Sequence, residues 1–336
     1  MSGTNWQSAL KPRWLKVIGE RKLMAEVYHI PAMLDETIAG LAVRPEGVYV
    51  DVTLGGGGHS REILRRLNAK GHLYSFDQDA EAISNQLSAI GGQPAAISSQ
   101  IFAKWTLVHG NFRYLANFMD YYGVEQIDGL LADLGVSFHH FDEAERGFSF
   151  RFDGPLDMRM NQHGGRTAAE IVNSYSHDDL TRALYLYGEL KNAKQLASRI
   201  IAARPVETTW DLLEAVTGSR SQEMDPRKKK EVTCVFQALR IEVNDELGAL
   251  REMLLAAKEL LRPGGRIAIL TYHSLEDRIV KNFLRSGNLD GTIEKDFYGN
   301  ILTPFKLIEK GLTASEEEVA RNPRARSAKL RVAEKI

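Results

Sequence analysis

The feature that most constrains this chain is the string VYVDVTLGGGGHS at residues 48–60. A β-branched run ending on Asp51 leads into four consecutive glycines, Gly55 to Gly58, and then into a helix-like segment at 61–67. Glycine can adopt positive φ, and it lets a ligand approach the backbone without meeting a Cβ. The first turn of a helix adds unpaired N–H groups that face the ligand. The string therefore predicts a strand, a Gly-rich turn and a helix N-terminus around a nucleotide-type crevice.

A second carboxylate supports this interpretation. Asp77 ends the strand-like run LYSFD and follows Gly58 by nineteen residues, near the roughly 20-residue offset at which a Rossmann-type carboxylate meets a ribose hydroxyl. Gly55, Gly57 and Ser60 nearly fit the dinucleotide pattern, but Asp51 would be a poor neighbour for a pyrophosphate. A cationic ligand with a ribose and no phosphate, such as S-adenosylmethionine, suits the stretch better. A flexible glycine turn without a ligand is the alternative.

Strand-like and helix-like patterns alternate along much of the chain. Further strands are expected at 105–109, 127–137 and 266–274, with helical spacing at 33–41, 80–90 and 114–122. Such alternation predicts a parallel sheet whose ligands lie at the carboxyl ends of the strands. Gly55 to Gly58, Asp77, Phe112 and Asp133 all fall at such ends. We therefore expect an α/β, Rossmann-like fold.

The alternation stops at residue 138 and resumes after 232. Residues 138–232 are polar and mostly helical in pattern, and Thr167 with Glu170 forms a capping box. One long helix is then expected over 235–261. We predict a basic arm at 1–27, a discontinuous sheet domain at 28–137 and 233–336 with a basic C-terminal tail, and an inserted helical substrate-recognition domain at 138–232.

The net charge, the cysteine count and the length of the apolar runs exclude several classes of protein. A net charge of −1 excludes a uniformly basic nucleic-acid binder but permits local basic patches. The single cysteine, Cys234, excludes an intramolecular disulfide. No apolar run approaches the roughly 18 residues that span a bilayer. A solvated basic arm is favoured over an organelle presequence, so we expect a cytoplasmic protein that does not contact membranes.

Several longer strings coincide with one family: DVTLGGGGHS at 51–60, LADLGVS at 131–137, RGFSF at 146–150, LDMRM at 156–160, FQALRIEVN at 236–244, HSLED at 273–277 and NPRARSAKLR at 322–331. Together they resemble the bacterial small-subunit ribosomal RNA (cytosine-N4) methyltransferases (RsmH/MraW), over about residues 29–331. The resemblance implies a class I S-adenosylmethionine-dependent methyltransferase. It would methylate the exocyclic N4 of a cytidine in the decoding region of 16S ribosomal RNA, within an assembled or nearly assembled 30S particle and without a metal.

Carried over residue by residue, the family's cofactor contacts would fall on Gly57, Gly58, His59, Asp77, Phe112, Asp133 and His140. His140 departs from the family pattern, which commonly has Pro-Gln in this motif where the chain has Phe138-His139-His140.

Methylating an amine requires a group that accepts its N–H bonds, because the cytosine lone pair is delocalised into the ring. Asp133 is the first candidate, with a structural or cofactor-binding carboxylate as the alternative. His29 and His273 could accept the proton or act as structural hydrogen-bonders. Carbon-5 methylation would need a nucleophile, and Cys234 lies on an apolar helical stripe, so the nitrogen target is preferred. Phe138, Phe148 or Tyr272 could stack on a flipped base.

The basic residues Arg146, Arg159, Arg324, Arg326 and Lys329 are expected to contact RNA phosphates. His139, His140, Asp142 and Glu143 could suggest a metal site, but adjacent side chains in an irregular segment point apart, which favours an RNA-facing loop. Two other classes stay open: a non-catalytic RNA-binding or ribosome-assembly factor that retains the fold, and an NAD-linked oxidoreductase, which Asp51 disfavours.

Overall fold

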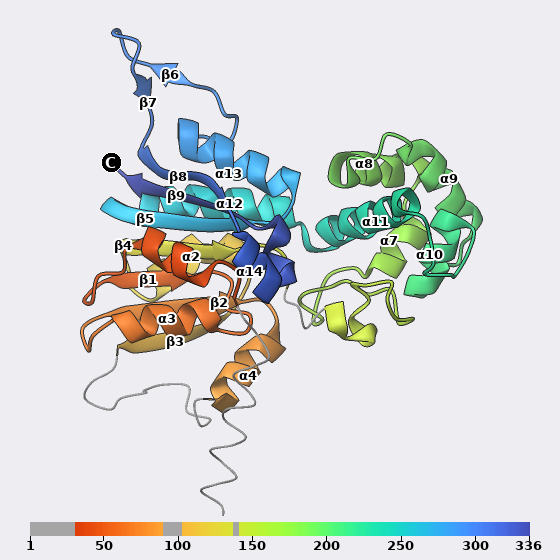
Figure 1. The fold of residues 1–336 in the computed structure, drawn as a ribbon, viewed down its shortest axis with the longest axis horizontal. Coiled ribbons are helices and arrows are strands. Elements are labelled where there is room, and N and C mark those ends of the chain that lie inside the picture. The colour runs from red at the N-terminus through yellow and green to blue at the C-terminus, as the bar shows by residue number, and fades with distance from the viewer. Residues whose placement is uncertain (1–30, 90–102, 137–140) are drawn as a thin grey trace, which may run out of the picture.

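Seven strands form one sheet in the order β3-β2-β1-β4-β5-β9-β8 (Figure 1). The computed structural model describes residues 31–89, 103–136 and 141–336. The strands are β1 (Val48–Asp51), β2 (His72–Asp77), β3 (Lys104–His109), β4 (Ile127–Asp133), β5 (Leu261–Thr271), β8 (Phe305–Thr313) and β9 (Lys329–Lys335). The first five are mutually parallel, whereas β9 runs antiparallel to both β5 and β8. The predicted Rossmann-like class is confirmed, because the order 3-2-1-4-5 is that of a doubly wound sheet.

Alternate residues of each strand enter opposite hydrophobic cores, as the two-residue period of a strand requires. Tyr49 and Leu131 pack on the face covered by α2 (Leu34–Leu41) and α3 (Gly58–Arg66). Val50 and Leu130 pack on the other face, under α5 (Leu115–Tyr121), α12 (Glu246–Leu260) and α13 (Ser274–Ser286). The sheet is therefore covered on both sides, and its polar side chains are left for the strand ends. Helix α4 (Ala80–Ala89) follows β2.

The helical insert has a core of its own beside the sheet (Figure 1). Its helices are α7 (Ala168–Ser174), α8 (His177–Gly188), α9 (Ala193–Ala202), α10 (Thr209–Thr217) and α11 (Pro226–Asn244). The predicted capping box is present: Thr167 Oγ1 accepts from the N–H of Glu170, and the Glu170 carboxylate accepts from the N–H of Thr167.

The predicted domain boundary at residue 232 falls inside helix α11. Its buried residues Val232, Val235 and Leu239 belong to the same core as the inserted helices. We propose that the inserted unit extends to Asn244, the last residue of α11. The predicted basic arm, residues 1–27, lies outside the described residues.

The prediction of a single long helix over 235–261 is wrong, because the helix is interrupted at Asp245. Asp245 has a φ of 46° and separates α11 from α12. Asp and Asn tolerate this left-handed conformation better than most side chains. The preceding Asn244 bonds across to the insert, donating to the carbonyl of Met158 and accepting from the N–H of Met160.

The prediction of a basic tail at the C-terminus is also wrong, because residues 329–335 form an interior strand of the sheet. Strand β9 lies between β5 and β8, and Leu330, Val332 and Ala333 are buried. Arg331 lies beside Asp277, with its Nε 2.7 Å from the carboxylate. The segment before β9 folds as α14 (Glu316–Arg321) and a 3-10 turn, η3 (Pro323–Ser327).

Between α13 and β8, a short hairpin of β6 (Glu294–Lys295) and β7 (Ile301–Leu302) projects away from the body (Figure 1). Among the described residues, no helix is both long and apolar enough to cross a bilayer.

Candidate active site

A cavity of about 460 Å³ lies at the carboxyl end of the parallel strands, between the sheet and the insert. This volume falls within the roughly 300–1,000 Å³ typical of small-molecule sites. The sheet contributes the glycine turn, Asp77, Phe112, Asp133 and Tyr272, and the insert contributes Phe141, Arg151, Met160 and one face of α11. The cavity therefore lies where the strand ends predict a ligand.

The four-glycine turn forms the floor at the start of α3. Gly57 is the N-cap residue, with a φ of 73°. A Cβ on Gly57 would lie 2.7 Å from Gln86 Oε1, and one on Gly58 would lie 2.7 Å from Pro31 Cγ. The positive φ favours glycine at position 57, and a side chain at position 58 would collide with the Pro31 ring. Gly57, Gly58 and His59 all line the cavity, as predicted cofactor contacts should.

Asp51 was expected to lie beside a cationic ligand, but it does not line the cavity. Its side chain is fully buried and is not among the cavity-lining residues. Its carboxylate accepts from Ser60 Oγ at 2.6 Å and from the N–H of Thr53 at 3.1 Å. Burial raises the pKa of Asp51, although the bond from Ser60 opposes that rise. Asp51 thus fixes the turn between β1 and α3 and does not face a cationic ligand.

Asp77 supports the turn and still faces the cavity. One oxygen accepts from the N–H of Gly55 at 2.8 Å, and the other accepts from the N–H of Asp79 at 2.9 Å. Phe112, at the start of a 3-10 turn after β3, lines the same side. Asp77 and Phe112 both line the cavity, and their contact with a ribose stays a prediction.

Asp133 ends β4 in the wall of the cavity and is held by its neighbours. Its N–H donates to Thr53 Oγ1 at 2.6 Å, and its Oδ1 accepts from the Tyr272 hydroxyl at 2.6 Å. Its side chain is 21% exposed. Burial raises the pKa of Asp133 to about 7, although the Tyr272 bond lowers it in part. Burial also raises the pKa of Tyr272 well above 10, so the tyrosine keeps its proton and donates it.

His59 lies behind Asp133 and is almost fully buried. Its Nε2 lies 3.2 Å from the carbonyl of Ala32, and its Nδ1 lies 3.7 Å from Asp133 Oδ2. Burial lowers the pKa of His59, so the ring is neutral at neutral pH. Because the carbonyl requires a proton on Nε2, the nitrogen nearer Asp133 is the unprotonated one. The pair is therefore not an ion pair.

The opposite wall comes from α11, where Thr233, Gln237 and Arg240 share one face at helical spacing. Arg240 forms a two-point ion pair with Glu246, at 2.7 and 2.9 Å. At the rim, Arg151 and Arg324 approach the carboxylate of Asp142 at 3.7 and 3.1 Å. The sequence prediction included neither this α11 face nor Arg151. The available signal was the polar spacing 233, 237, 240 opposite the apolar residues of the helix.

His273 lines the cavity as the N-cap of α13. Its Nδ1 accepts from the N–H of Glu276 at 3.5 Å, and its Nε2 lies 3.1 Å from the Glu276 carboxylate. Burial would raise the pKa of Glu276, but the bond with His273 and nearby positive charge lower it below the ordinary value. The cap that Nδ1 provides at the start of α13 favours the structural alternative for His273.

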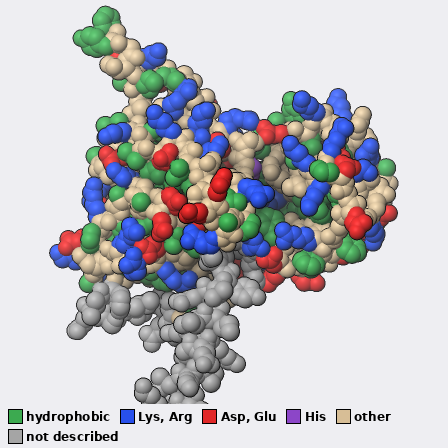
Figure 2. Space-filling model, in the orientation of Figure 1, with side chains coloured by type: hydrophobic (Ala, Val, Ile, Leu, Met, Phe, Trp, Pro, Cys, Tyr) green, Lys and Arg blue, Asp and Glu red, His purple; other side chains and the backbone are tan. Residues whose placement is uncertain are grey.

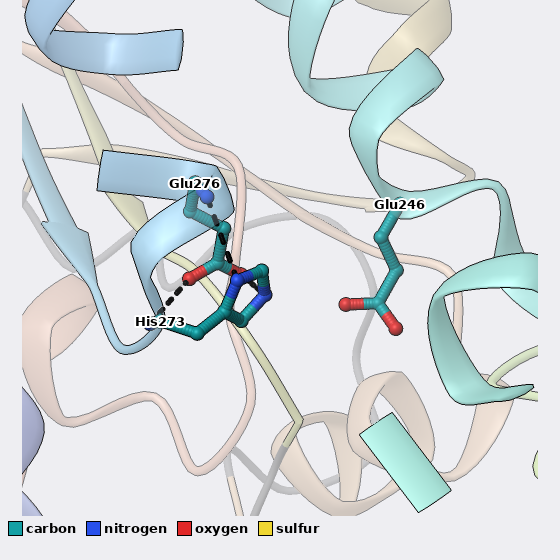
Figure 3. A group of neighbouring side chains, drawn as sticks. All are labelled: Glu246, His273 and Glu276. Carbon is teal, nitrogen blue, oxygen red and sulfur yellow. Dashed lines mark hydrogen bonds and ion pairs between the residues drawn. The ribbon is translucent and has the colours of Figure 1, made fainter. Parts of the chain in front are cut away.

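Glu246, His273 and Glu276 form the one group among the described residues whose ligand atoms lie close enough to hold a metal ion (Figure 3). Figure 3 shows Glu246 facing the other two across a gap. Both oxygens of Glu246 bond the Arg240 guanidinium, however. A cation there would have to displace a buried positive charge, so the group fits an ion pair better than a metal.

Some predicted site residues cannot be placed. His29, Phe138 and His140 lie outside the described residues. Of the other proposed stacking residues, Phe148 is 4% exposed in the core of the insert, whereas Tyr272 lines the cavity.

The predicted RNA contacts separate into two groups. Arg324 and Arg326 are exposed on η3. Arg146 is 4% exposed and bonds Asp79 at 3.0 Å together with two carbonyls, so it attaches the insert to the start of α4 and offers no surface for a phosphate. Arg159 bonds Asp157 at two points, and Lys329 lies 3.2 Å from Asp277.

Comparisons with known proteins agree with this geometry. Residues 26–336 match the MraW methylase family. The ribosomal RNA small subunit methyltransferase H of Phocaeicola vulgatus is 55% identical over 314 residues, covering 92% of this chain and 98% of that protein. The enzyme of the same name from Porphyromonas gingivalis is 55% identical over 320 residues, covering 92% and 97%.

Among solved structures, a putative rRNA methylase from Clostridium thermocellum aligns over 92% of this chain and all of its own, at 15% identity and a TM-score of 0.41. A score of this size adds nothing to what the strand order establishes. The match over residues 26–336 and the two relatives at 55% identity together establish the family of this chain. The chain belongs to the MraW methylase family.

Proposed function

We propose that the protein transfers a methyl group from S-adenosylmethionine to the exocyclic N4 of a cytidine in small-subunit ribosomal RNA. The observation that carries this proposal is the Asp133 carboxylate, held by Tyr272 in the cavity wall of an MraW family member. The relatives at 55% identity are named ribosomal RNA small subunit methyltransferases.

The cavity fits the cofactor. Asp77 lines the cavity beside the turn at the start of α3, at the strand end where a Rossmann-type carboxylate meets ribose hydroxyls. We assign cofactor contacts to Gly57, Gly58, His59, Asp77 and Phe112, which all line the cavity. When bound, S-adenosylmethionine supplies an electrophilic methyl group.

Asp133 is the residue we assign to the acceptor amine. Its Oδ1 accepts a hydrogen bond from the Tyr272 hydroxyl. Within the described part of the chain, its Oδ2 lies 3.7 Å from His59 Nδ1, which is too far for a hydrogen bond. Oδ2 can therefore accept an N–H bond from the amine and withdraw its proton. A pKa of about 7 lies near the operating pH, where proton transfer is most effective.

Cys234 supports a nitrogen target over carbon-5. The thiol is half-buried against the core of the insert, and Cys234 is not among the cavity-lining residues, although its neighbour Thr233 is. Burial raises the pKa of Cys234, which disfavours the thiolate that would attack the ring.

The finer substrate assignment rests on the family resemblance. We place the target cytidine in the decoding region of 16S ribosomal RNA, in an assembled or nearly assembled 30S particle. Such a substrate requires a cytoplasmic enzyme. Arg324, which lines the cavity, and Arg326 are both exposed, and they are the predicted RNA contacts best placed to meet phosphates.

The test is methylation of undermodified small-subunit particles with labelled S-adenosylmethionine, followed by mass mapping of the modified nucleotide. We expect one N4-methylated cytidine in the decoding region. A 5-methylcytosine product would overturn the nitrogen assignment. Binding to particles without label transfer would favour the assembly-factor alternative.

A further inference from the structure

The β6–β7 hairpin carries the most exposed aromatic side chains of the described chain, and the proposed chemistry does not use them. Phe297 is 97% exposed and Tyr298 is 85% exposed, with their ring centroids 5.6 Å apart. Ile301 and Leu302 follow at 45% and 53%. Figure 2 shows this hydrophobic group at the end of the projecting arm. A soluble protein seldom presents such a patch without a binding role.

The turn that presents the two aromatics is well defined. Asp296 Oδ1 accepts from the N–H of Tyr298 at 2.9 Å and of Asn300 at 2.8 Å, and its Oδ2 accepts from the Asn300 side chain at 2.9 Å. These bonds turn the carboxylate inward and leave Phe297 and Tyr298 at the outermost positions. Ordered presentation of this kind suits recognition, because less freedom is lost on binding.

The route from the cavity to this tip is basic. Helix α13 begins directly after the cavity residues Tyr272 and His273, and its exposed face carries Lys281 and Arg285, four residues apart. Lys295 on β6 and Lys306 on β8 continue the exposed positive charge, against Asp290 and Glu294. Within the described ranges, none of these four cations forms an ion pair. Figure 2 shows Lys and Arg side chains below the arm.

We propose that the hairpin and the basic face of α13 form a second RNA-binding surface, on which Phe297 and Tyr298 stack on unpaired bases of the small-subunit RNA. The chemistry of the surface indicates RNA, because cations bind phosphates and exposed aromatic rings stack on bases. The 13 residues of α13 separate the hairpin from the cavity by roughly 20 Å at 1.5 Å per residue. The hairpin therefore meets RNA far from the target cytidine and contributes to particle recognition rather than to chemistry. The inference rests on the proposed function.

The first experiment measures the KM for small-subunit particles in the double variant Phe297→Ala and Tyr298→Ala. We expect KM to rise by about tenfold or more, the scale for losing a stacked base. The turnover rate and the S-adenosylmethionine affinity should not change. Tyr121→Ala is the matched control, because Tyr121 is 81% exposed on α5. An unchanged KM in an active double variant overturns the inference, whereas an inactive wild-type protein would instead count against the proposed function.

A second pair of variants separates stacking from apolar docking. Phe297→Tyr with Tyr298→Phe keeps both rings and should keep the wild-type KM. Leucine at both positions keeps apolar area without a ring, and it should behave like the alanine variant. Full binding by the leucine variant overturns base stacking and points to a protein partner.

The contribution of the α13 cations can be measured separately, through the salt dependence of RNA affinity. Removing Lys281 and Arg285 together by alanine substitution should flatten the dependence of log affinity on log salt by about 1.4–1.8, the change for two phosphate contacts. A photoreactive residue at position 298 should crosslink to RNA. Exclusive crosslinking to a ribosomal protein would reject the RNA assignment.

Discussion

The ends of β1 and β4 look alike in sequence and differ in the structure. Each strand ends on an aspartate followed within a few residues by glycine, and the two strands pair directly. Asp51 is fully buried and bonded by Ser60 and Thr53, whereas Asp133 faces the cavity and bonds Tyr272. The same residue type at neighbouring strand ends therefore serves structure in one place and, in our proposal, chemistry in the other.

Thr53 connects the two positions. Its hydroxyl lies 3.3 Å from Asp51 Oδ1 and accepts from the N–H of Asp133 at 2.6 Å. The fully buried carboxylate of Asp51 thus helps to fix the backbone from which the cavity-facing carboxylate of Asp133 projects. The comparison predicts that changes at Asp51 act on stability and that changes at Asp133 act on rate.

The largest effect is expected from Asp133→Asn. The substitution keeps the shape and an acceptor for Tyr272 but removes the charge that would accept the amine proton. Methyl transfer at saturating cofactor should fall by roughly 10² or more, while cofactor binding stays within a few-fold. Single-turnover rates measured beside calorimetry test this. A near wild-type rate would contradict the catalytic assignment, and affinity that falls with the rate would make Asp133 a cofactor-binding residue.

Asp51→Ala should lower the free energy of unfolding by about 2–3 kcal/mol, because it leaves the Ser60 hydroxyl and the N–H of Thr53 without their buried acceptor. Denaturant unfolding measures this change. Asp120→Ala, at an exposed position on α5, is the control. A stable Asp51 variant with weakened cofactor affinity would restore Asp51 as a ligand contact.

Asp77→Ala should weaken S-adenosylmethionine binding by about 1.5–3 kcal/mol, the scale for losing a charged hydrogen bond. Asp77 is intermediate between the other two carboxylates, since it supports the glycine turn and also lines the cavity. Calorimetry on the folded variant gives the affinity, with Asp178→Ala, a fully exposed side chain, as control. Unchanged affinity would remove Asp77 from the site.

Tyr272→Phe should slow methyl transfer about tenfold near pH 6.5 and much less at pH 9. The Tyr272 hydroxyl lowers the pKa of Asp133, so its removal raises that pKa further, and a charged hydrogen bond is worth roughly 1.5–3 kcal/mol. The readout is a displacement of the rate–pH midpoint to higher pH. A uniform loss at every pH would indicate that Tyr272 only shapes the cavity.

The smallest effect concerns stability against pH. The pKa of Asp133 is raised to about 7 in the folded protein, so between about pH 4 and 7 the folded state binds more protons than the unfolded state. Stability contributed by this group therefore falls as pH rises through that window. The full shift would be worth about 4 kcal/mol, and the partial exposure of the Asp133 side chain to solvent reduces it. Asp133→Asn should therefore be more stable than wild type by about 1–2 kcal/mol at pH 8 and nearly equal at pH 4. Equal stability at both pH values would show that the charge is well solvated.

The sequence predicted the strand ends because a parallel sheet places all of them at one edge. The direction of the Asp51 side chain could not be predicted, since it depends on Ser60, which packs against it only in the folded protein. Strand β9 was missed because its alternating apolar residues are interspersed with Lys329 and Arg331, which read as a basic tail. Arg146 looked like an RNA contact because its partner Asp79 lies far away in sequence.

Strands β4 and β5 pair side by side although the whole helical insert separates them in sequence. Closing a chain loop becomes less favourable by only about 0.6 kcal/mol for each doubling of its length. An insert that gathers around its own core also shortens the effective span between its two ends. The sheet can therefore accommodate this large excursion at its centre with a modest loss of chain entropy, and the interruption supplies the second wall of the cavity.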